Sequence, residues 1–167
     1  SSPLEHFAWG RFHSWEVGWY MQEVILTEDE LQQLCAEYQK VLRLQDWTIV
    51  VRVLRARDFE LKDCVGECRW VLPRKEAIIH ILDPVDYPPG DKFPQDMERS
   101  LVHELLHLHF AAISEKAERA GVDIDVELEQ AFHGIDGAIS ALRRAVKASQ
   151  EHLNNHTPGQ EPKEEEL

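Results

Sequence analysis

Apolar positions follow helical and strand periods in separate segments of the chain. After Thr27, the residues at helical spacing are Leu31, Leu34, Cys35, Tyr38, Val41 and Leu42, and this predicts an amphipathic helix. Thr27 and Glu30 match a capping box, in which each side chain accepts a hydrogen bond from the other residue's backbone N–H. We therefore expect the helix to begin at Thr27.

Three short runs rich in β-branched and aromatic residues follow, at 47–54, 64–72 and 77–82. Runs of this kind favour strands. Residues 73–76 (Pro-Arg-Lys-Glu) have the composition of a hairpin connection between the second and third runs.

Two longer helical segments complete the pattern. Pro94 follows a proline-rich loop and suits the first turn of a helix that reaches about residue 118 and stops before Gly121. A last helix from near Asp125 carries an apolar stripe expected to face the core, namely Leu128, Ala131, Phe132, Ile135, Ile139, Leu142 and Val146. This order predicts an α+β domain with helices on one face of a small, mostly antiparallel three-stranded sheet.

The 167 residues suit one domain. We divide them into an aromatic N-terminal arm (1–23), a folded domain (24–149) and an acidic tail expected to be disordered (150–167). The net charge of −13 makes nucleic acid an unexpected partner. Three cysteines are too few for a disulfide framework, so we expect buried thiols at Cys64 and Cys68 rather than a metal pair. No apolar run reaches membrane-spanning length and no signal peptide is visible, which favours a cytoplasmic protein without membrane contact. The sequence indicates no particular oligomeric state.

The chemistry of the chain is concentrated in His103-Glu104-Leu105-Leu106-His107. Two histidines four residues apart lie on one face of a helix and can bind one zinc ion. Glu104, beside them, can take a proton from a zinc-activated water and pass it to a leaving amine. Leu101, Leu105 and Leu108 are expected to hold the opposite side of this helix to the core.

A third zinc ligand is needed, and the sequence leaves two candidates open. The position six residues after His107 is Ile113, so a third histidine of the metzincin kind is absent there. Glu129 and Glu127, on the following helix, lie on opposite sides of its apolar stripe. We prefer Glu129, because Glu127 lies in the first turn, where acidic residues often serve the helix dipole. Asp123 and Asp125 fit better as caps.

Further polar residues have weaker claims to a role in the site. His133, one turn after Glu129, could donate a hydrogen bond to a ligand carboxylate or to an oxyanion. Tyr87, in the proline-rich loop, could stabilise an oxyanion, but packing against prolines is the simpler interpretation. His80 is expected to be an alternating residue of its strand.

The HExxH helix followed by a helix with candidate carboxylates resembles the minimal gluzincins. It is also similar to zincin-like domains of the ImmA/IrrE type and of phage-encoded metallopeptidases. The resemblance implies a zincin-like fold, a zinc ion, and a carboxylate from the last helix as third ligand. It also implies that the strand at 77–82 is a sheet edge that pairs with an extended peptide. The thermolysin-type Asn-Glu motif is not found after the histidines.

The leading hypothesis is a zinc-dependent metallopeptidase acting on a peptide or protein substrate. One alternative is a regulatory, partner-binding protein that keeps the zincin fold with restricted or no catalysis, and the aromatic arm and acidic tail suit that role. Another is a metal-dependent hydrolase of a different acyl bond.

Overall fold

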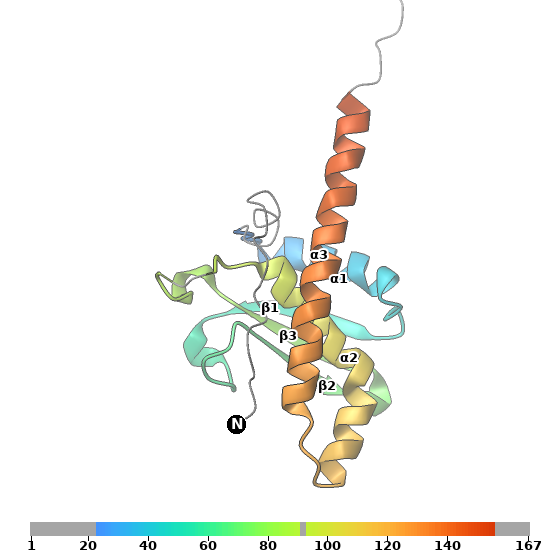
Figure 1. The fold of residues 1–167 in the computed structure, drawn as a ribbon. Coiled ribbons are helices and arrows are strands. Elements are labelled where there is room, and N and C mark those ends of the chain that lie inside the picture. Colours follow the sequence, from blue (N-terminus) through green and yellow to red (C-terminus); the bar gives the residue numbers. More distant parts are fainter. Residues whose placement is uncertain (1–22, 91–92, 156–167) are drawn as a thin grey trace, which may run out of the picture.

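The first helix begins where the sequence predicts. The computed structural model describes residues 23–90 and 93–155 (Figure 1). Helix α1 (Glu28–Val41) has Thr27 as its N-cap, and both hydrogen bonds of the capping box with Glu30 are present. Short 3-10 turns connect the later elements and span Ala56–Asp58, Leu72–Arg74 and Pro84–Asp86.

The sheet has three strands, but its topology differs from the prediction. Strands β1 (Thr48–Leu54), β2 (Gly66–Val71) and β3 (Glu76–Leu82) are ordered β1-β3-β2. The β1–β3 pair is parallel and the β2–β3 pair is antiparallel, so the sheet is mixed rather than mostly antiparallel. The expectation that residues 77–82 form a sheet edge is wrong, because β3 lies in the centre. Its nearly continuous apolar sequence suits a strand with neighbours on both sides.

One edge of the sheet is covered by a helix and the other is not. Helix α1 covers the free edge of β1: the Gln32 amide donates to Ile49 O and accepts from Val51 N, and Glu28 accepts from Val53 N. These side chains therefore bond the backbone groups of β1 that another strand would otherwise pair with. Among the described residues, strand β2 is therefore the open edge of the sheet.

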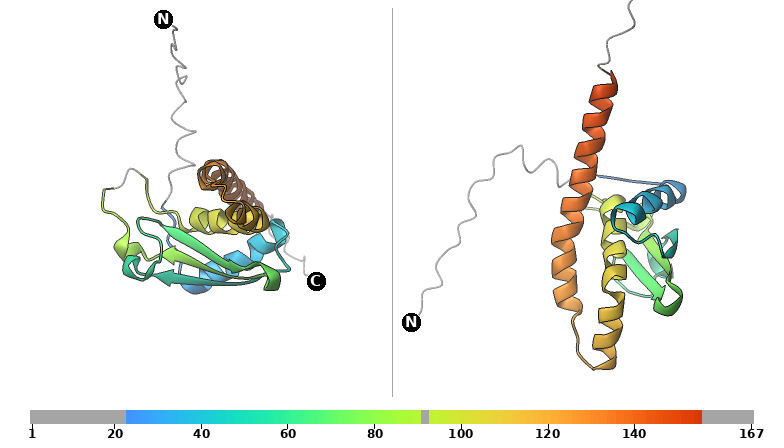
Figure 2. Two further views of the ribbon diagram at one scale, coloured as in Figure 1. Left: turned by 90° about the horizontal axis from the view of Figure 1, so that it is seen from below. Right: turned by 90° about the vertical axis from the view of Figure 1, so that its right-hand side faces the viewer.

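Helices α1 and α2 (Met97–Arg119) both pack on one face of the sheet (Figure 2). Alternate strand residues point toward them, and the resulting cluster includes Leu31, Tyr38, Ile49, Val51, Ile79, Ile81, Leu101, Leu105 and Leu108. This agrees with the predicted placement of helices on one face. Asp96 caps α2 by accepting from Arg99 N at 2.9 Å, and Gly121, with φ of 69°, lies in the turn after it.

Helix α3 (Asp125–Asn155) packs on α2 and forms a third layer (Figures 1 and 2). It continues past residue 150, where the sequence predicted disorder to begin. The rest of the tail (156–167) and nearly all of the aromatic arm (1–22) lie outside the described residues. Within the described part, no helix combines the length and apolar character needed to cross a membrane.

The predicted apolar stripe of α3 is mostly not in the core. Phe132 is buried, and Leu128 and Ile139 are half-buried. Ile135, Leu142 and Val146 are 42%, 67% and 56% exposed. The side that faces the protein body is instead largely polar and comprises Asp136, Ser140, Arg143 and Arg144. The periodicity was correct for a helix but wrong for which side is buried, because charged contacts determine how α3 docks.

Those charged contacts involve two buried or half-buried acids at the start of α2. Arg144 donates to both Asp96 oxygens at 2.6 and 2.7 Å and to Glu98 at 2.7 Å. Arg143 donates to Glu98 at 3.2 Å, and Tyr38 of α1 donates to the same carboxylate at 2.7 Å. Hydrogen-bonded ion pairs of this kind are strongly directional, so they fix the rotation of α3.

Candidate metal centre

Helix α2 presents both motif histidines toward a cleft. Leu101, Leu105 and Leu108, on the other side of the helix, are at most 4% exposed. The rings of His103 and His107 lie 5.2 Å apart between centroids, and their side chains are 12% and 21% exposed. This arrangement follows from the four-residue spacing, which stacks one ring a turn above the other.

Glu129 of α3 lies against both histidines. One carboxylate oxygen is 3.1 Å from His103 Nε2, and the other is 3.3 Å from His107 Nε2. The donor atoms of these three residues all lie within 4.8 Å of one another. Glu127 is exposed and belongs to no such group. Of the two carboxylates that the sequence left open, the structure thus brings Glu129 to the histidines.

Phe132 explains why Glu129 is held there. Its ring lies 4.8 Å from the His107 ring and 5.7 Å from the His103 ring, in edge-to-face geometry, and it is fully buried. Glu129 lies three residues earlier and therefore on the same side of the helix. The apolar contact of one residue sets the position of the other.

Glu104 lies deeper than the histidines, against strand β2. Its side chain is close to Gly66, where an added Cβ would be 2.5 Å from Glu104 Oε1, so any other residue at position 66 would displace the carboxyl group. Burial raises the pKa of Glu104 to about 8, and the nearby carboxylates of Glu129 and Glu67 add to the rise while His103 opposes it. A cation near this carboxyl group would favour its ionised form.

Asp136, which orients His103, was not among the site residues predicted from the sequence. Its carboxylate accepts from His103 Nδ1 at 2.9 Å and from Arg99 Nε at 2.7 Å, and its side chain is 2% exposed. This contact leaves Nε2 of His103 pointing toward Glu129. Burial alone would lower the pKa of His103, but the hydrogen bond with Asp136 and the nearby Glu104 and Glu129 carboxylates raise it overall. The signal in the sequence was an acid two turns after Glu129 on the same face of the helix.

His133, which the sequence suggested as a supporting residue, lies at the rim. Its side chain is 65% exposed, 3.9 Å from Glu129 Oε2 and 3.8 Å from Asp136 Oδ2. Both distances exceed those of a hydrogen bond, so the predicted hydrogen bond is not formed here. Asp136 occupies the supporting position instead.

Among the described residues, two groups have donor atoms close enough to share one ion: His103, His107 and Glu129, or His103, His133 and Asp136. The second group is less suitable, because Arg99 already neutralises Asp136 and His103 Nδ1 is bound to it. The first group offers two imidazole nitrogens and one carboxylate, a ligand set that zinc accepts. The residues therefore fit a zinc ion.

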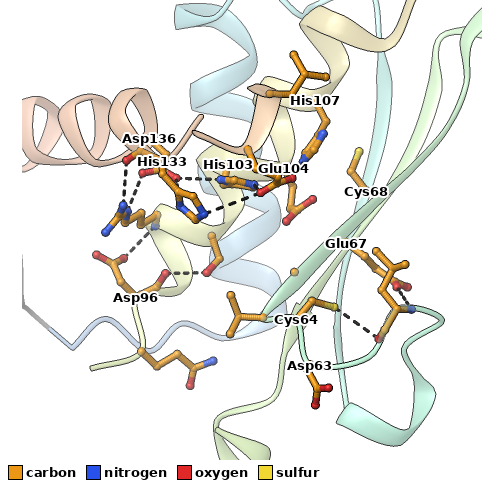
Figure 3. A pocket seen from close by; sticks show the side chains of 18 of the residues that line it. Asp63, Cys64, Glu67, Cys68, Asp96, His103, Glu104, His107, His133 and Asp136 are labelled. Carbon is orange, nitrogen blue, oxygen red and sulfur yellow. Dashed lines mark hydrogen bonds and ion pairs between the residues drawn. The ribbon is translucent and has the colours of Figure 1, made fainter. Parts of the chain in front are cut away.

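A cleft of about 890 Å³ opens over this group. It is bordered by strand β2, by the facing sides of α2 and α3, and by segments before β2 and before α2 (Figure 3). Tyr87 lines it and donates from its hydroxyl to Phe93 O at 2.9 Å. The cleft gives a ligand access to both histidines.

Cys64 and Cys68 also line this cleft, half-buried rather than buried as predicted. Burial raises the pKa of both thiols, and neither belongs to a donor group among the described residues. His80 is not simply an alternating strand residue, because its Nδ1 lies 2.7 Å from the buried Glu67 carboxylate. That carboxylate also accepts from the backbone N–H groups of Glu60 and Leu61 at 3.2 Å, which anchors the segment before β2.

Comparison with family models, with curated proteins and with solved structures found no match.

Proposed function

We propose that this α+β chain is a zincin-like, zinc-dependent metallopeptidase. The observation that carries the proposal is the convergence of His103 Nε2, His107 Nε2 and the Glu129 carboxylate beside buried Glu104. His103, His107 and Glu129 would bind the ion. When bound, zinc would supply a Lewis acid and a water activated near neutral pH.

The protein's own groups have separate tasks in this proposal. Glu104 accepts the proton of the attacking water and delivers it to the leaving amine. Asp136 holds the proton on Nδ1 of His103 and so keeps Nε2 free as a ligand. Gly66 leaves room for the Glu104 carboxyl group.

The open edge of the sheet supports a peptide as the substrate. The hydrogen bond from Leu82 N to Val65 O fixes the register of the β2–β3 pair. Because backbone groups alternate in an antiparallel pair, those of Cys68 and Trp70 point away from β3. Both residues line the cleft, so an extended peptide could pair with β2 alongside Glu104. The sequence had assigned this peptide pairing to residues 77–82, which form the central strand β3.

The test is hydrolysis of unfolded casein by the zinc-loaded chain, compared with Glu104→Gln and the exposed control Glu127→Gln. We expect Glu104→Gln to retain zinc and to lose activity by about 100-fold or more, because a general base contributes about 10²–10⁴-fold. Glu127→Gln should match the wild type. Zinc binding without hydrolysis of casein or of any peptide in a substrate panel would contradict the peptidase proposal. It would favour the regulatory protein or a hydrolase of another acyl bond.

A further inference from the structure

Helix α3 carries an apolar surface that nothing in the described part of the chain covers. We call it the outer face, defined as Ala131, Ile135, Ala138, Leu142, Ala145, Val146, Ser149 and Leu153, all exposed. Its exposed large side chains reach 67% at Leu142 and 69% at Leu153. Contiguous exposed apolar surface of this kind marks an interaction site.

The spacing of the outer face indicates what would cover it. Positions 131, 135, 138, 142, 145 and 149 alternate between steps of four and three residues, which is the seam of a two-helix coiled coil. The charged residues of the same stretch lie elsewhere: Asp136, Arg143 and Arg144 face the protein body, and Lys147 follows Arg143 one turn later. The surface therefore suits a helix with a similar uncharged seam.

The length of α3 provides a second observation. Its last eleven residues, 145–155, are all exposed, and this end projects beyond the other elements (Figures 1 and 2). A lone helical segment of that length is marginal in water. A projecting end that carries Val146 and Leu153 needs a surface to pack on.

We propose that a second copy of this chain binds the outer face, with the two α3 helices antiparallel. The seam is complementary to itself in that orientation. When Ile135 of one copy lies beside Ala145 of the other, Leu142 lies beside Ala138, so large residues face small ones. The projecting end of each α3 then packs along the anchored part of the other α3.

The charge distribution leaves the outer face as the surface at which two copies can meet. Each copy carries a net charge of −13, so most surfaces of two copies repel each other. The outer face has no charged residue between 131 and 149, and two copies can approach there without burying an unpaired charge. Since the remaining surfaces repel, added salt should strengthen the dimer.

The first experiment measures the mass of the full chain by sedimentation velocity, with Leu142→Glu and the control Val85→Glu. Val85 is 74% exposed in a turn away from α3, so both variants add one charge at an exposed position. We expect wild type and Val85→Glu to be dimeric. Leu142→Glu should weaken dimerisation by about 100-fold or more, because each dimer would bury two unpaired carboxylates. Its zinc content and far-UV spectrum should be unchanged.

A second experiment tests the antiparallel orientation with Ile135→Cys, Ala145→Cys and the double variant, with the parent protein oxidised in parallel. Residues ten apart on one helix are about 15 Å apart, too far for an internal disulfide. We expect dimer cross-links from the double variant only. Cross-links from either single variant would contradict the antiparallel pairing.

Other outcomes would overturn the proposal. One is a chain that stays monomeric at high micromolar concentration. Another is a dimer that Leu142→Glu leaves intact. A third is a monomer that dimerises only after residues 1–22 are deleted, which would identify the aromatic arm as the occupant. None of these results depends on whether the protein binds zinc.

Discussion

Helices α2 and α3 both supply residues to the candidate site, but different forces attach them to the protein. Helix α2 is buried through Leu101, Leu105 and Leu108 against the sheet and α1. Helix α3 buries Phe132 as its large apolar residue and otherwise docks through ion pairs of Arg143, Arg144 and Asp136. The difference shows that the residues of the site on α2 are held by the hydrophobic core, whereas those on α3 are held mainly by ion pairs at the surface of that core. The two helices should therefore respond differently to mutation.

The largest effect is expected in the core contact of α2. Leu105→Ala removes a fully buried side chain on the side of α2 that faces the core and should lower the free energy of unfolding by about 2–5 kcal/mol. Val41→Ala in α1, where the side chain is 72% exposed, should change it by less than about 0.5 kcal/mol. Urea unfolding of the metal-free proteins measures both values. Equal effects would show that α2 is not held by the core.

The next effect depends on pH and comes from Glu104. Its folded-state pKa of about 8 lies above the usual value of 4.5, so between these pH values the folded state binds the proton that the unfolded state has lost. Stability of the metal-free protein therefore falls as pH rises from 4.5 to 8. Glu104→Gln should remove about 2–4 kcal/mol of that fall. Parallel unfolding curves for wild type and Glu104→Gln across this pH range would disprove the assigned burial.

A smaller effect is expected where α3 is attached. Arg144→Gln leaves Asp96 without its arginine partner and Glu98 with Arg143 as its remaining cation, and should destabilise the protein by about 2–3 kcal/mol. This is at the lower end of the cost of breaking a buried pair, because one cation remains. Lys147→Gln, at an exposed position of the same helix, should have no measurable effect on stability. Thermal unfolding of the two variants gives the comparison.

The smallest effect separates the two candidates for supporting His103. Asp136→Asn should weaken zinc binding by about 10–100-fold, the usual cost of losing a partner of a metal-ligating histidine. His133→Ala, at the exposed rim, should change it by less than about threefold. Competition titration with a zinc chelator measures the dissociation constants. A larger loss of zinc affinity in His133→Ala than in Asp136→Asn would assign the supporting role to His133, as the sequence suggested.

These contrasts also explain how much could be predicted from the sequence. The histidine pair and the leucines behind it depend on local helical spacing, and the structure has both. The central place of β3, the contact between Gly66 and Glu104, and the hydrogen bond from His103 to Asp136 join residues far apart in the chain. No periodicity encodes them. The docking side of α3 was mispredicted because Arg144, Asp96 and Glu98 outweigh an apolar stripe, and that balance exists only in the folded protein.

The central claim is that His103, His107 and Glu129 bind one zinc ion. X-ray absorption at the zinc edge tests it directly on the wild type, Glu129→Gln and Glu127→Gln. We expect two histidine nitrogens at about 2.0–2.1 Å and oxygen at about 2.0–2.2 Å. Glu129→Gln should change this first shell and Glu127→Gln should leave it as in the wild type. Failure to bind stoichiometric zinc, or a first shell without histidine, would contradict the account.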